Sequence, residues 1–459
     1  MAQRGVDKGE RGQALILMAL AMVGLLGFAA LALDGGNLYT EQRRAQAAAD
    51  NAVMSAAYTQ MRSTSTNAVL SAAAMANAQI NDYVDSDART EIAFNRPPLR
   101  GPYTGDDDYM EVVITSTVTT ALAHLVYGQN PIPLTVSAVA HGTPQEPIMN
   151  GYALASMKPT CGGENMIAMQ GRGGGSTGGT YLWGGGAFVN ATCSDALEMS
   201  GGESFYTDGP PIDVVGSGSG GGVTGSSCTA PNVPNNCNYY PAPTTGVDPV
   251  DQDVIASSPA GTPPPCGPAR TLSAELTDGD GRTIRPGAYT TLDYGNAAMT
   301  MSPGIYCLTG GTLTGKASVT GVGVMLYLTD VDASIDFSGN DAIVVSLSAP
   351  NTDTTGCTGT DDDSQTICTY LGIVVYKLVG HDSCEQNDVE IDFTGQASKV
   401  VIGLVYAPHS LVRFGGNGDL YMTGQTIAGC VKFNGNGRIE IYYDPTNTYS
   451  PPPSIRLDQ

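Results

Sequence analysis

Residues 14–33 read ALILMALAMVGLLGFAALAL and carry no charged side chain. A run of about 20 apolar residues is long enough for a helix to cross the hydrocarbon core of a bilayer. This stretch predicts a single membrane-spanning helix that follows a short cytoplasmic tail at residues 1–13. A cleavable signal peptide is the alternative, because Ala30-Leu31-Ala32 offers a small-x-small site, although the apolar part of such peptides usually spans only about 7 to 15 residues.

Basic residues next to the apolar run predict its orientation. Arg4, Lys8 and Arg11 precede the run, and Lys and Arg beside a membrane span tend to stay in the cytoplasm. Arg43 and Arg44 on the far side weaken this asymmetry. We expect a single-pass protein in the cytoplasmic membrane, with its N-terminus inside and its body outside the cytoplasm.

The cysteines agree with an exported body. All 10 cysteines lie beyond residue 160, and an even set confined to one region indicates disulfides formed outside the cytosol. A metal site is the less favoured alternative, because only His381 and Cys384 have a spacing that resembles a ligand pair. The short separations favour two local disulfides, Cys228 with Cys237 and Cys357 with Cys368.

Composition restricts the class of protein. The net charge is −23 with 14% charged residues, whereas binding to nucleic acid requires a basic surface. The 59 glycines and 28 prolines are typical of a turn-rich β protein, and 459 residues predict more than one domain.

Residues 34–143 are predicted to form a small α+β module. Residues 37–61 contain no Pro or Gly and are rich in strong helix formers, and 67–83 read as a second amphipathic helix. Residues 109–119 and 132–142 alternate as strands around a short helical piece at 121–128. The first helix has a small-residue face that suits close packing, either on its own domain or on a partner: Ala45, Ala48, Ala49, Ala52 and Ala56.

A distinctive set of residues flanks the apolar run: Arg11, Gly12, Gln13, Asp34, Tyr39, Arg43, Arg44, Gln46, Ala49 and Asp50. With these residues the start of the chain resembles the TadE/TadG-like proteins of Flp (tight adherence) pilus assembly. The resemblance covers residues 9–141 and implies Tad pilus-assembly proteins as partners. Type IV prepilins carry Glu five residues after the processed Gly, but this chain has Leu17 there, so an assembly or anchoring role fits better than a major pilin.

Residues 144–450 are predicted to form an all-β body with a repeat. The motif hydrophobic-x-Phe-x-Gly-Asn/Gln recurs around Phe337, Phe393, Phe414 and Phe433, with looser echoes at Met169, Met199, Leu308 and Met422. The spacing predicts a right-handed parallel β-helix, a solenoid in which Phe points inward and Gly turns the corners, with a Gly/Pro-rich insertion near 206–270. An irregular β-sandwich is the alternative. Residues 451–459 read as a Pro-rich tail.

Signs of chemistry are scarce, so we expect no catalytic residues and no cofactor. The four histidines (His124, His141, His381 and His409) lie in no catalytic motif. Carboxylates that could serve a polysaccharide-active enzyme are Asp330, Asp332, Asp336, Asp341, Glu390 and Asp392. Weak calcium candidates are Asp278, Asp280, Asp361, Asp362 and Asp363, for which solvated acidic turns are the favoured interpretation.

The favoured hypothesis is a non-enzymatic, membrane-anchored envelope protein of a Flp/Tad-type pilus assembly or adhesion system. Its displayed β-rich body would meet a surface carbohydrate or protein ligand. One alternative is a membrane-tethered β-helix enzyme acting on polysaccharide, since fold alone does not give function. A second alternative is a pilin-like subunit that assembles through the Ala-rich helix.

Overall fold

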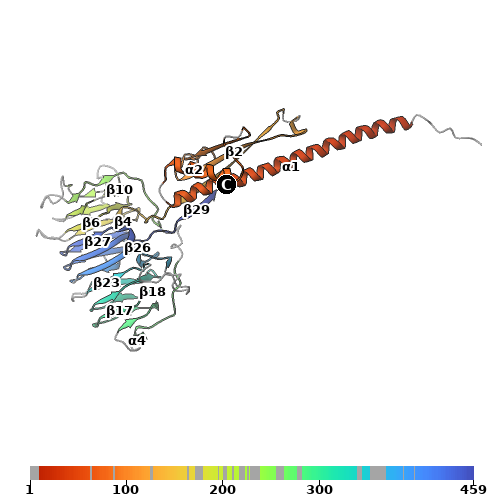
Figure 1. Ribbon diagram of the computed structural model, residues 1–459. Helices are drawn as coiled ribbons and strands as arrows, with labels where there is room; N and C mark the ends of the chain where they lie inside the picture. Colours follow the sequence, from red (N-terminus) through yellow and green to blue (C-terminus); the bar gives the residue numbers. More distant parts are fainter. Residues whose placement is uncertain are drawn as a thin grey trace, which may run out of the picture. The chain divides into compact units, whose positions relative to one another are not determined.

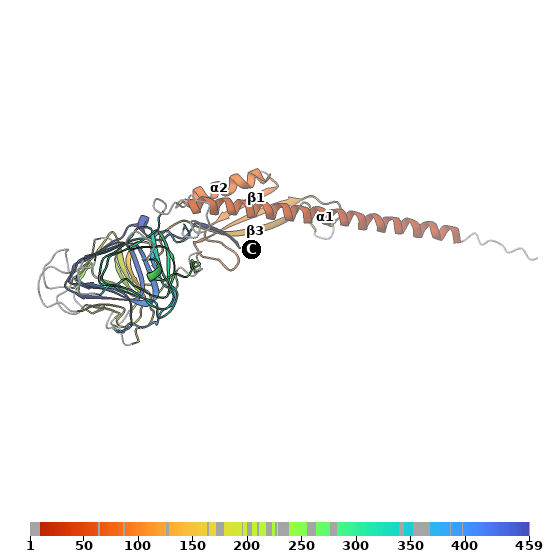
Figure 2. The ribbon, with the colours of Figure 1, turned by 90° about the horizontal axis from the view of Figure 1, so that it is seen from below.

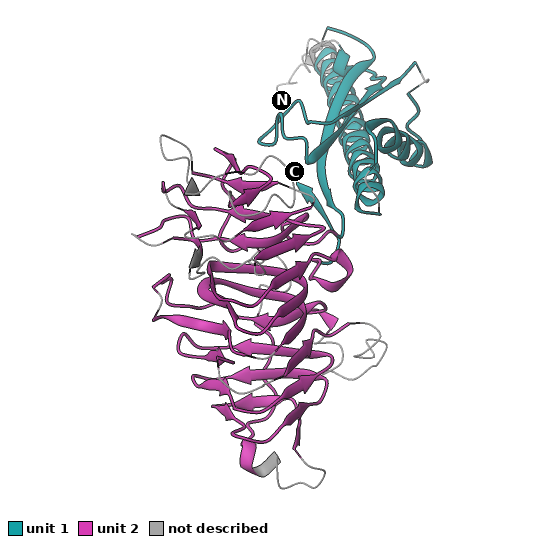
Figure 3. Ribbon diagram, turned by 90° about the vertical axis from the view of Figure 1, so that its left-hand side faces the viewer, with its two compact units in different colours: residues 1–145, 452–459 teal, residues 146–451 magenta. Residues whose placement is uncertain are grey.

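The chain forms two compact units, residues 1–145 with 452–459 and residues 146–451 (Figure 3). The computed structural model describes residues 10–62, 65–85, 88–124, 128–162, 165–170, 179–194, 196–199, 204–208, 211–216, 223–224, 227, 238–254, 263–275, 282–338, 344–351, 368–385, 387–396 and 398–458. Sequence patterning puts the boundary at 143/144, whereas the structure puts it at 145/146.

A single long helix begins the first unit. Helix α1 spans Glu10–Arg62 without interruption, and its N-terminal half stands free of the rest of the unit (Figure 1). The side chains of Leu15, Met18 and Phe28 are 72%, 74% and 75% exposed, so no protein surface covers this apolar stretch. Among the described residues, α1 is the one helix long and apolar enough to cross a membrane.

The C-terminal half of α1 packs on its own unit through the small-residue face. Ala45, Ala48, Ala49, Ala52 and Ala56 are all buried beside strands β2 (Tyr109–Val118) and β3 (Ile132–Thr143) and helix α2 (Asn67–Ile80). The approach is close, because a Cβ added at Gly142 of β3 would lie 2.2 Å from the carbonyl oxygen of Ala57. Of the two surfaces considered for this face, the structure uses the chain's own sheet.

The sheet of the first unit has four antiparallel strands. Their order is β1 (Thr90–Asn95), β2, β3 and β29 (Ser454–Asp458), and α1 lies along the sheet (Figure 2). The prediction of a Pro-rich tail at 451–459 is wrong for these last residues. The short alternating segment Ser454–Asp458 pairs with the otherwise open edge of β3, and an open edge is where an added strand satisfies unpaired backbone groups.

The second unit is built from short strands. In chain order they are β4 (Tyr152–Ser156), β5 (Ile167–Gln170), β6 (Thr180–Trp183), β7 (Gly186–Val189), β8 (Leu197–Met199), β9 (Phe205–Thr207), β10 (Ile212–Val214), β11 (Val223–Thr224), β12 (Tyr239–Tyr240), β13 (Thr244–Thr245), helix α4 (Leu272–Glu275), β14 (Thr283–Ile284), β15 (Gly287–Tyr289), β16 (Leu292–Asp293), β17 (Met299–Met301), β18 (Gly304–Leu308), β19 (Thr312–Thr314), β20 (Val319–Gly321), β21 (Val324–Leu328), β22 (Ser334–Asp336), β23 (Val345–Ser348), β24 (Ile373–Tyr376), β25 (Val389–Phe393), β26 (Lys399–Gly416), β27 (Leu420–Gly435), β28 (Ile439–Tyr442) and the 3₁₀ turn η2 (Pro445–Asn447).

These strands form one large parallel sheet with a three-strand period. From β14 to β25 each strand pairs in parallel with the strand three positions later, which gives three parallel series. All three series reach β26, and β26 pairs along its length with β27. The pairing shows a β-rich body with a large parallel sheet, as the repeat predicts.

The order of stacking departs from the order of the chain. Strand β27 pairs with β4 and β5, and β28 pairs with β6, so strands β4–β13 continue the stack beyond β27. The expected insertion near 206–270 is therefore wrong for β10–β13, which pair within the sheet. The sequence misleads here because Gly and Pro surround strands of only two or three residues.

Residues 246–282 lead from β13 to β14. Two kinds of contact hold the described part of this connection. The side-chain amide of Asn190 donates to the carbonyl oxygen of Val250 at 2.8 Å and accepts from the Val250 N–H at 3.0 Å. Cys266 forms a disulfide with Cys307 of β18. The connection therefore docks on the sheet at these points.

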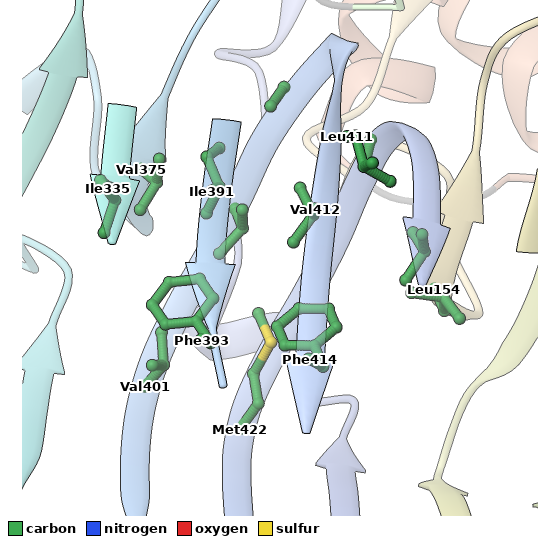
Figure 4. Close-up of a cluster of buried hydrophobic side chains, with 14 of the residues drawn as sticks. Leu154, Ile335, Val375, Ile391, Phe393, Val401, Leu411, Val412, Phe414 and Met422 are labelled. Carbon is green, nitrogen blue, oxygen red and sulfur yellow. The ribbon is translucent and has the colours of Figure 1, made fainter. Parts of the chain in front are cut away.

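The phenylalanine repeat forms a column in the core. Neighbouring rings of Phe337, Phe393, Phe414 and Phe433 have centroids 6.0, 5.7 and 5.8 Å apart. Figure 4 shows Phe393 and Phe414 among the buried side chains around them. The strand register continues from Phe433 to Met169 and Met199, as the looser echoes suggest. Leu308 and Met422, however, belong to other series of strands.

The glycines of the repeat stand where strands approach closely. Gly416 and Gly435 have φ of +101° and +102°, a region that only glycine enters readily. A Cβ at Gly416 would lie 2.0 Å from the carbonyl oxygen of Gly395. The motif thus pairs a buried aromatic side chain with a close backbone approach that excludes side chains.

Candidate functional site: the membrane-proximal helix

Asp34 is the first charged residue after the apolar stretch, and its carboxylate is buried at 3% exposure. It accepts hydrogen bonds from three successive backbone N–H groups, those of Ala121 (2.8 Å), Leu122 (2.7 Å) and Ala123 (2.8 Å). These bonds lower the pKa of Asp34, because they favour the ionised carboxylate. Asp34 thereby fixes α1 to the segment before β3, at the point where the helix leaves the apolar stretch.

Gln46 makes a second attachment of α1 to the sheet. Its Nε2 atom donates to Asp50 Oδ1 at 2.8 Å and to the carbonyl oxygen of Ser137 in β3 at 3.1 Å. Ala49, which lies between Gln46 and Asp50 in the sequence, is fully buried. These three positions of the family motif therefore have a structural role.

The remaining motif residues on this part of α1 face solvent. Tyr39 is 60% exposed, and the Arg43 guanidinium lies 5.7 Å from its ring centroid. Arg44 forms a surface ion pair with Asp82 at 3.7 Å, and such exposed pairs contribute little to stability. These side chains lie outside the buried core of the unit. Arg11, Gly12 and Gln13 lie in the first turns of α1.

Disulfides join cysteines of the second unit. Those described are Cys161–Cys193, Cys266–Cys307 and Cys384–Cys430, and Cys368 is also disulfide-bonded. The predicted partner of Cys368, Cys357, lies outside the described residues, as do Cys228 and Cys237. A metal site at His381 and Cys384 is ruled out, since Cys384 is bonded to Cys430.

Buried carboxylates of the second unit pair with cations rather than with each other. Glu390 Oε2 lies 2.9 Å from Lys377 Nζ, and both side chains are buried, with exposures of 5% and 0%. Burial lowers the pKa of Lys377, and Glu390 opposes that change. Asp392 has Asp336 as its cross-strand neighbour but forms its ion pair with Arg413.

Of the other acidic candidates, Asp332 is linked to Glu390 through His381, whose Nε2 atom lies 3.6 Å from Asp332 Oδ1 and whose Nδ1 atom lies 3.0 Å from Glu390 Oε1. Asp330 and Asp332 cap a turn, with Asp332 N donating to Asp330 Oδ1 at 3.0 Å. Asp341 and the calcium candidates Asp278, Asp280, Asp361, Asp362 and Asp363 lie outside the described residues. Within the described part of the chain, no three His, Cys, Asp or Glu side chains are grouped as metal ligands.

Sequence reasoning missed one charged cluster, around His409. Its Nε2 and Nδ1 atoms each lie 2.9 Å from a carboxylate oxygen, of Asp253 and Asp382 respectively. Burial lowers the pKa of His409, but its hydrogen bonds to Asp382 and Asp253 and their charges outweigh burial and raise it. Asp253 belongs to the connection between β13 and β14, so no local motif could have indicated the cluster.

Comparison with known proteins supports the assignment of the first helix. The searches of curated proteins and of solved structures gave no match. One family model, described as putative Flp pilus-assembly TadE/G-like, matches residues 12–63. That range begins near the start of α1 and contains Asp34, Gln46 and Ala49, so residues 12–63 of this chain are similar to TadE/G-like Flp pilus-assembly proteins.

Proposed function

We propose that the protein is a non-enzymatic, single-pass membrane anchor of a Flp/Tad-type pilus assembly or adhesion system that displays its β-rich body outside the cytoplasm. One observation carries the proposal. The TadE/G-like match at residues 12–63 covers one continuous helix, whose exposed apolar half can cross a bilayer and whose other half holds a folded module.

The orientation rests on charge and on disulfides. Arg4 and Lys8 precede the span, and basic flanks favour the cytoplasmic side. Disulfides such as Cys161–Cys193 persist in oxidising compartments, which supports a body outside the cytosol.

We further propose that the body is a closed, right-handed parallel β-helix. The three-strand period supports closure, because three series of parallel strands that advance together describe the three faces of a solenoid. A right-handed path agrees with the handedness of parallel crossover connections in general.

The proposal of a non-enzymatic role is supported by the partners of the carboxylates. Glycoside hydrolysis needs two carboxyl groups that face one substrate, whereas Glu390 and Asp392 are engaged by Lys377 and Arg413. Partners from the Tad assembly would meet the exposed surface around Tyr39 and Arg43. The purified protein should release neither reducing ends nor unsaturated products from polysaccharides, and release of either would support the enzyme alternative.

The membrane experiment replaces residues 1–33 with a cleavable signal sequence, so that export is kept and the anchor is lost. The full-length protein should stay with membranes after an alkaline wash, whereas the replaced protein should be released in soluble form with intact disulfides. As a matched control, the variant Tyr39→Ala changes the helix surface outside the span and should keep membrane retention. Continued membrane association of the replaced protein would contradict the anchor.

A further inference from the structure

We propose that the outer face of β28, β6, β9 and β12 binds an extended, neutral polysaccharide through a row of aromatic side chains. This aromatic face consists of Tyr181, Trp183, Tyr206, Tyr240 and Tyr442. The inference deepens the proposed function and rests on it only in that the body is displayed outside the cytoplasm.

The strand pattern places these side chains on the outer surface of the sheet. Leu182, between Tyr181 and Trp183, is fully buried, as are Phe205 and Tyr239 next to Tyr206 and Tyr240. Because side chains alternate across a strand, the aromatic residues point away from the core. Tyr442 is 40% exposed, and the other four are partly exposed.

Packing does not require aromatic residues at these positions. The strand register aligns Tyr181 with Tyr206 and Tyr240, and the same outer ladder runs back through Glu440 and Tyr421 to β26. Further along, in β17, β20 and β23, the ladder carries Thr300, Thr320 and Ser346 instead. The same outward position is thus polar at Thr300, Thr320 and Ser346, whereas from Tyr421 to Tyr240 it is aromatic except at Glu440. Exposed apolar patches usually mark binding surfaces.

The rings form a connected, pre-organised surface. Ring centroids are 5.4 Å apart for Trp183 and Tyr206, 5.5 Å for Tyr206 and Tyr240, and 6.2 Å for Trp183 and Tyr442. Sheet hydrogen bonds fix the backbone beneath them. A ligand would therefore order few side chains on binding, which saves entropy.

Polar groups border the rings. The Arg438 guanidinium lies 4.5 Å from the Tyr181 ring centroid and 2.6 Å from Glu440 Oε1, while the Tyr442 hydroxyl donates to Glu440 Oε2 at 3.1 Å. The indole N–H of Trp183 is buried and is not one of these groups. The face thus offers apolar rings together with hydroxyl, guanidinium and carboxylate groups.

This combination fits a sugar chain best. A pyranose presents an apolar C–H face and a rim of hydroxyl groups, and Tyr and Trp provide rigid amphipathic area for both. Along the ladder the ring centroids of Tyr181, Tyr206 and Tyr240 are 6.0 and 5.5 Å apart, close to the length of one sugar residue in an extended chain. Nucleobases also stack on aromatic rings, but their phosphates need a basic groove, and a chain of net charge −23 repels both nucleic acids and acidic glycans.

The test uses the full-length protein in detergent. The single Trp of the chain lies in the aromatic face, so its fluorescence reports binding there directly. Titration with hexamers of glucose and of N-acetylglucosamine, both β-linked, should give a saturable fluorescence change with at least one of them. Polygalacturonate should give none.

Variants connect binding to the aromatic face. Tyr206→Thr introduces threonine, the residue type found at Thr300 on the same ladder. It should raise Kd at least about tenfold, as expected for a residue central to an interface. Trp183→Ala should reduce pelleting with insoluble chitin or cellulose. Tyr58→Ala is the matched control, because Tyr58 is 48% exposed on α1 with Arg62 5.7 Å from its ring, and it should leave binding unchanged.

The inference is overturned if neither hexamer nor either insoluble polymer binds, or if Tyr206→Thr and Tyr58→Ala behave alike. The inference is also overturned if polygalacturonate binds as well as the hexamers. The same holds if this face retains protein-free liposomes or another protein in place of glycan. Circular dichroism of each variant checks that the sheet is intact, and Tyr206→Phe, which keeps the ring, should retain most of the affinity. Membrane retention is measured separately, so failure here leaves the anchor proposal standing.

Discussion

Replacing Phe414 by Ala should destabilise the second unit more than any exposed substitution in the same strand. Phe414 is 1% exposed and stacks between Phe393 and Phe433 at 5.7 and 5.8 Å. Truncating a buried Phe to Ala costs about 3–5 kcal/mol. Hydrogen bonds keep the neighbouring strands at a fixed spacing, so the strands cannot close the cavity. We therefore expect a loss of unfolding free energy in the upper part of that range.

Denaturant unfolding monitored by tryptophan fluorescence measures this cost. Trp183 is the chain's single Trp and lies in the second unit, so the signal reports that unit alone. Phe414→Leu keeps most of the apolar volume and should lose clearly less stability than Phe414→Ala. Val400→Ala, at a 38% exposed position of the same strand, should cost under about 1 kcal/mol. Equal losses for Phe414→Ala and Val400→Ala would refute the stacked column as a stabilising element.

Three further predictions use the same unfolding assay. Lys377→Met leaves Glu390 buried without its cation and should cost about 3–5 kcal/mol, and adding Glu390→Gln should recover part of that loss. Cys266→Ser opens the disulfide to Cys307, whose separation of 41 residues corresponds to a loss of up to about 4 kcal/mol of unfolding free energy. Because the pKa of His409 is raised in the folded state, its contribution is fully present below the unfolded value of about 6.5 and is lost as pH rises through the folded value, so His409→Gln should reduce this pH dependence.

Local, periodic features could be predicted from the sequence. The uncharged run at 14–33 needs only length and composition, and α1 contains it. The inward column follows from Phe at a regular spacing, since parallel strands in register place equivalent residues above each other. The TadE/G-like segment was recognisable for the same reason, because its residues are close together in the chain.

Features that depend on distant pairing could not be predicted. In the sequence, Asp34 only marks the end of the apolar run. The three N–H groups that donate to its carboxylate lie near residue 122 and come close to it only in the folded chain. Strand β29 is a five-residue segment after prolines, and its role depends on the open edge of β3. Both contacts join residues more than eighty positions apart, for which a single sequence holds no signal.

Gln425 illustrates how a correct pattern can receive the wrong meaning. The segment Met422-Thr423-Gly424-Gln425 looks like a weak copy of the Phe motif, which would place Gln425 at a corner. Instead Gln425 is fully buried, and its Nε2 atom donates to the carbonyl oxygens of three residues at the start of the second unit, Ile148, Met149 and Tyr152. Its Oε1 atom accepts from the Thr448 hydroxyl near the end of that unit.

One side chain thus holds the start and the end of the body together beside β27, in the middle of the strand stack. Because the body starts and ends there, β4–β13 can extend the stack on one side of β27 while β14–β26 form the other, and a connection at 246–282 becomes necessary. A repeat reveals which residues stack but not in which order its copies are joined, and no period predicts the buried amide that bonds to both ends of the body where that order changes.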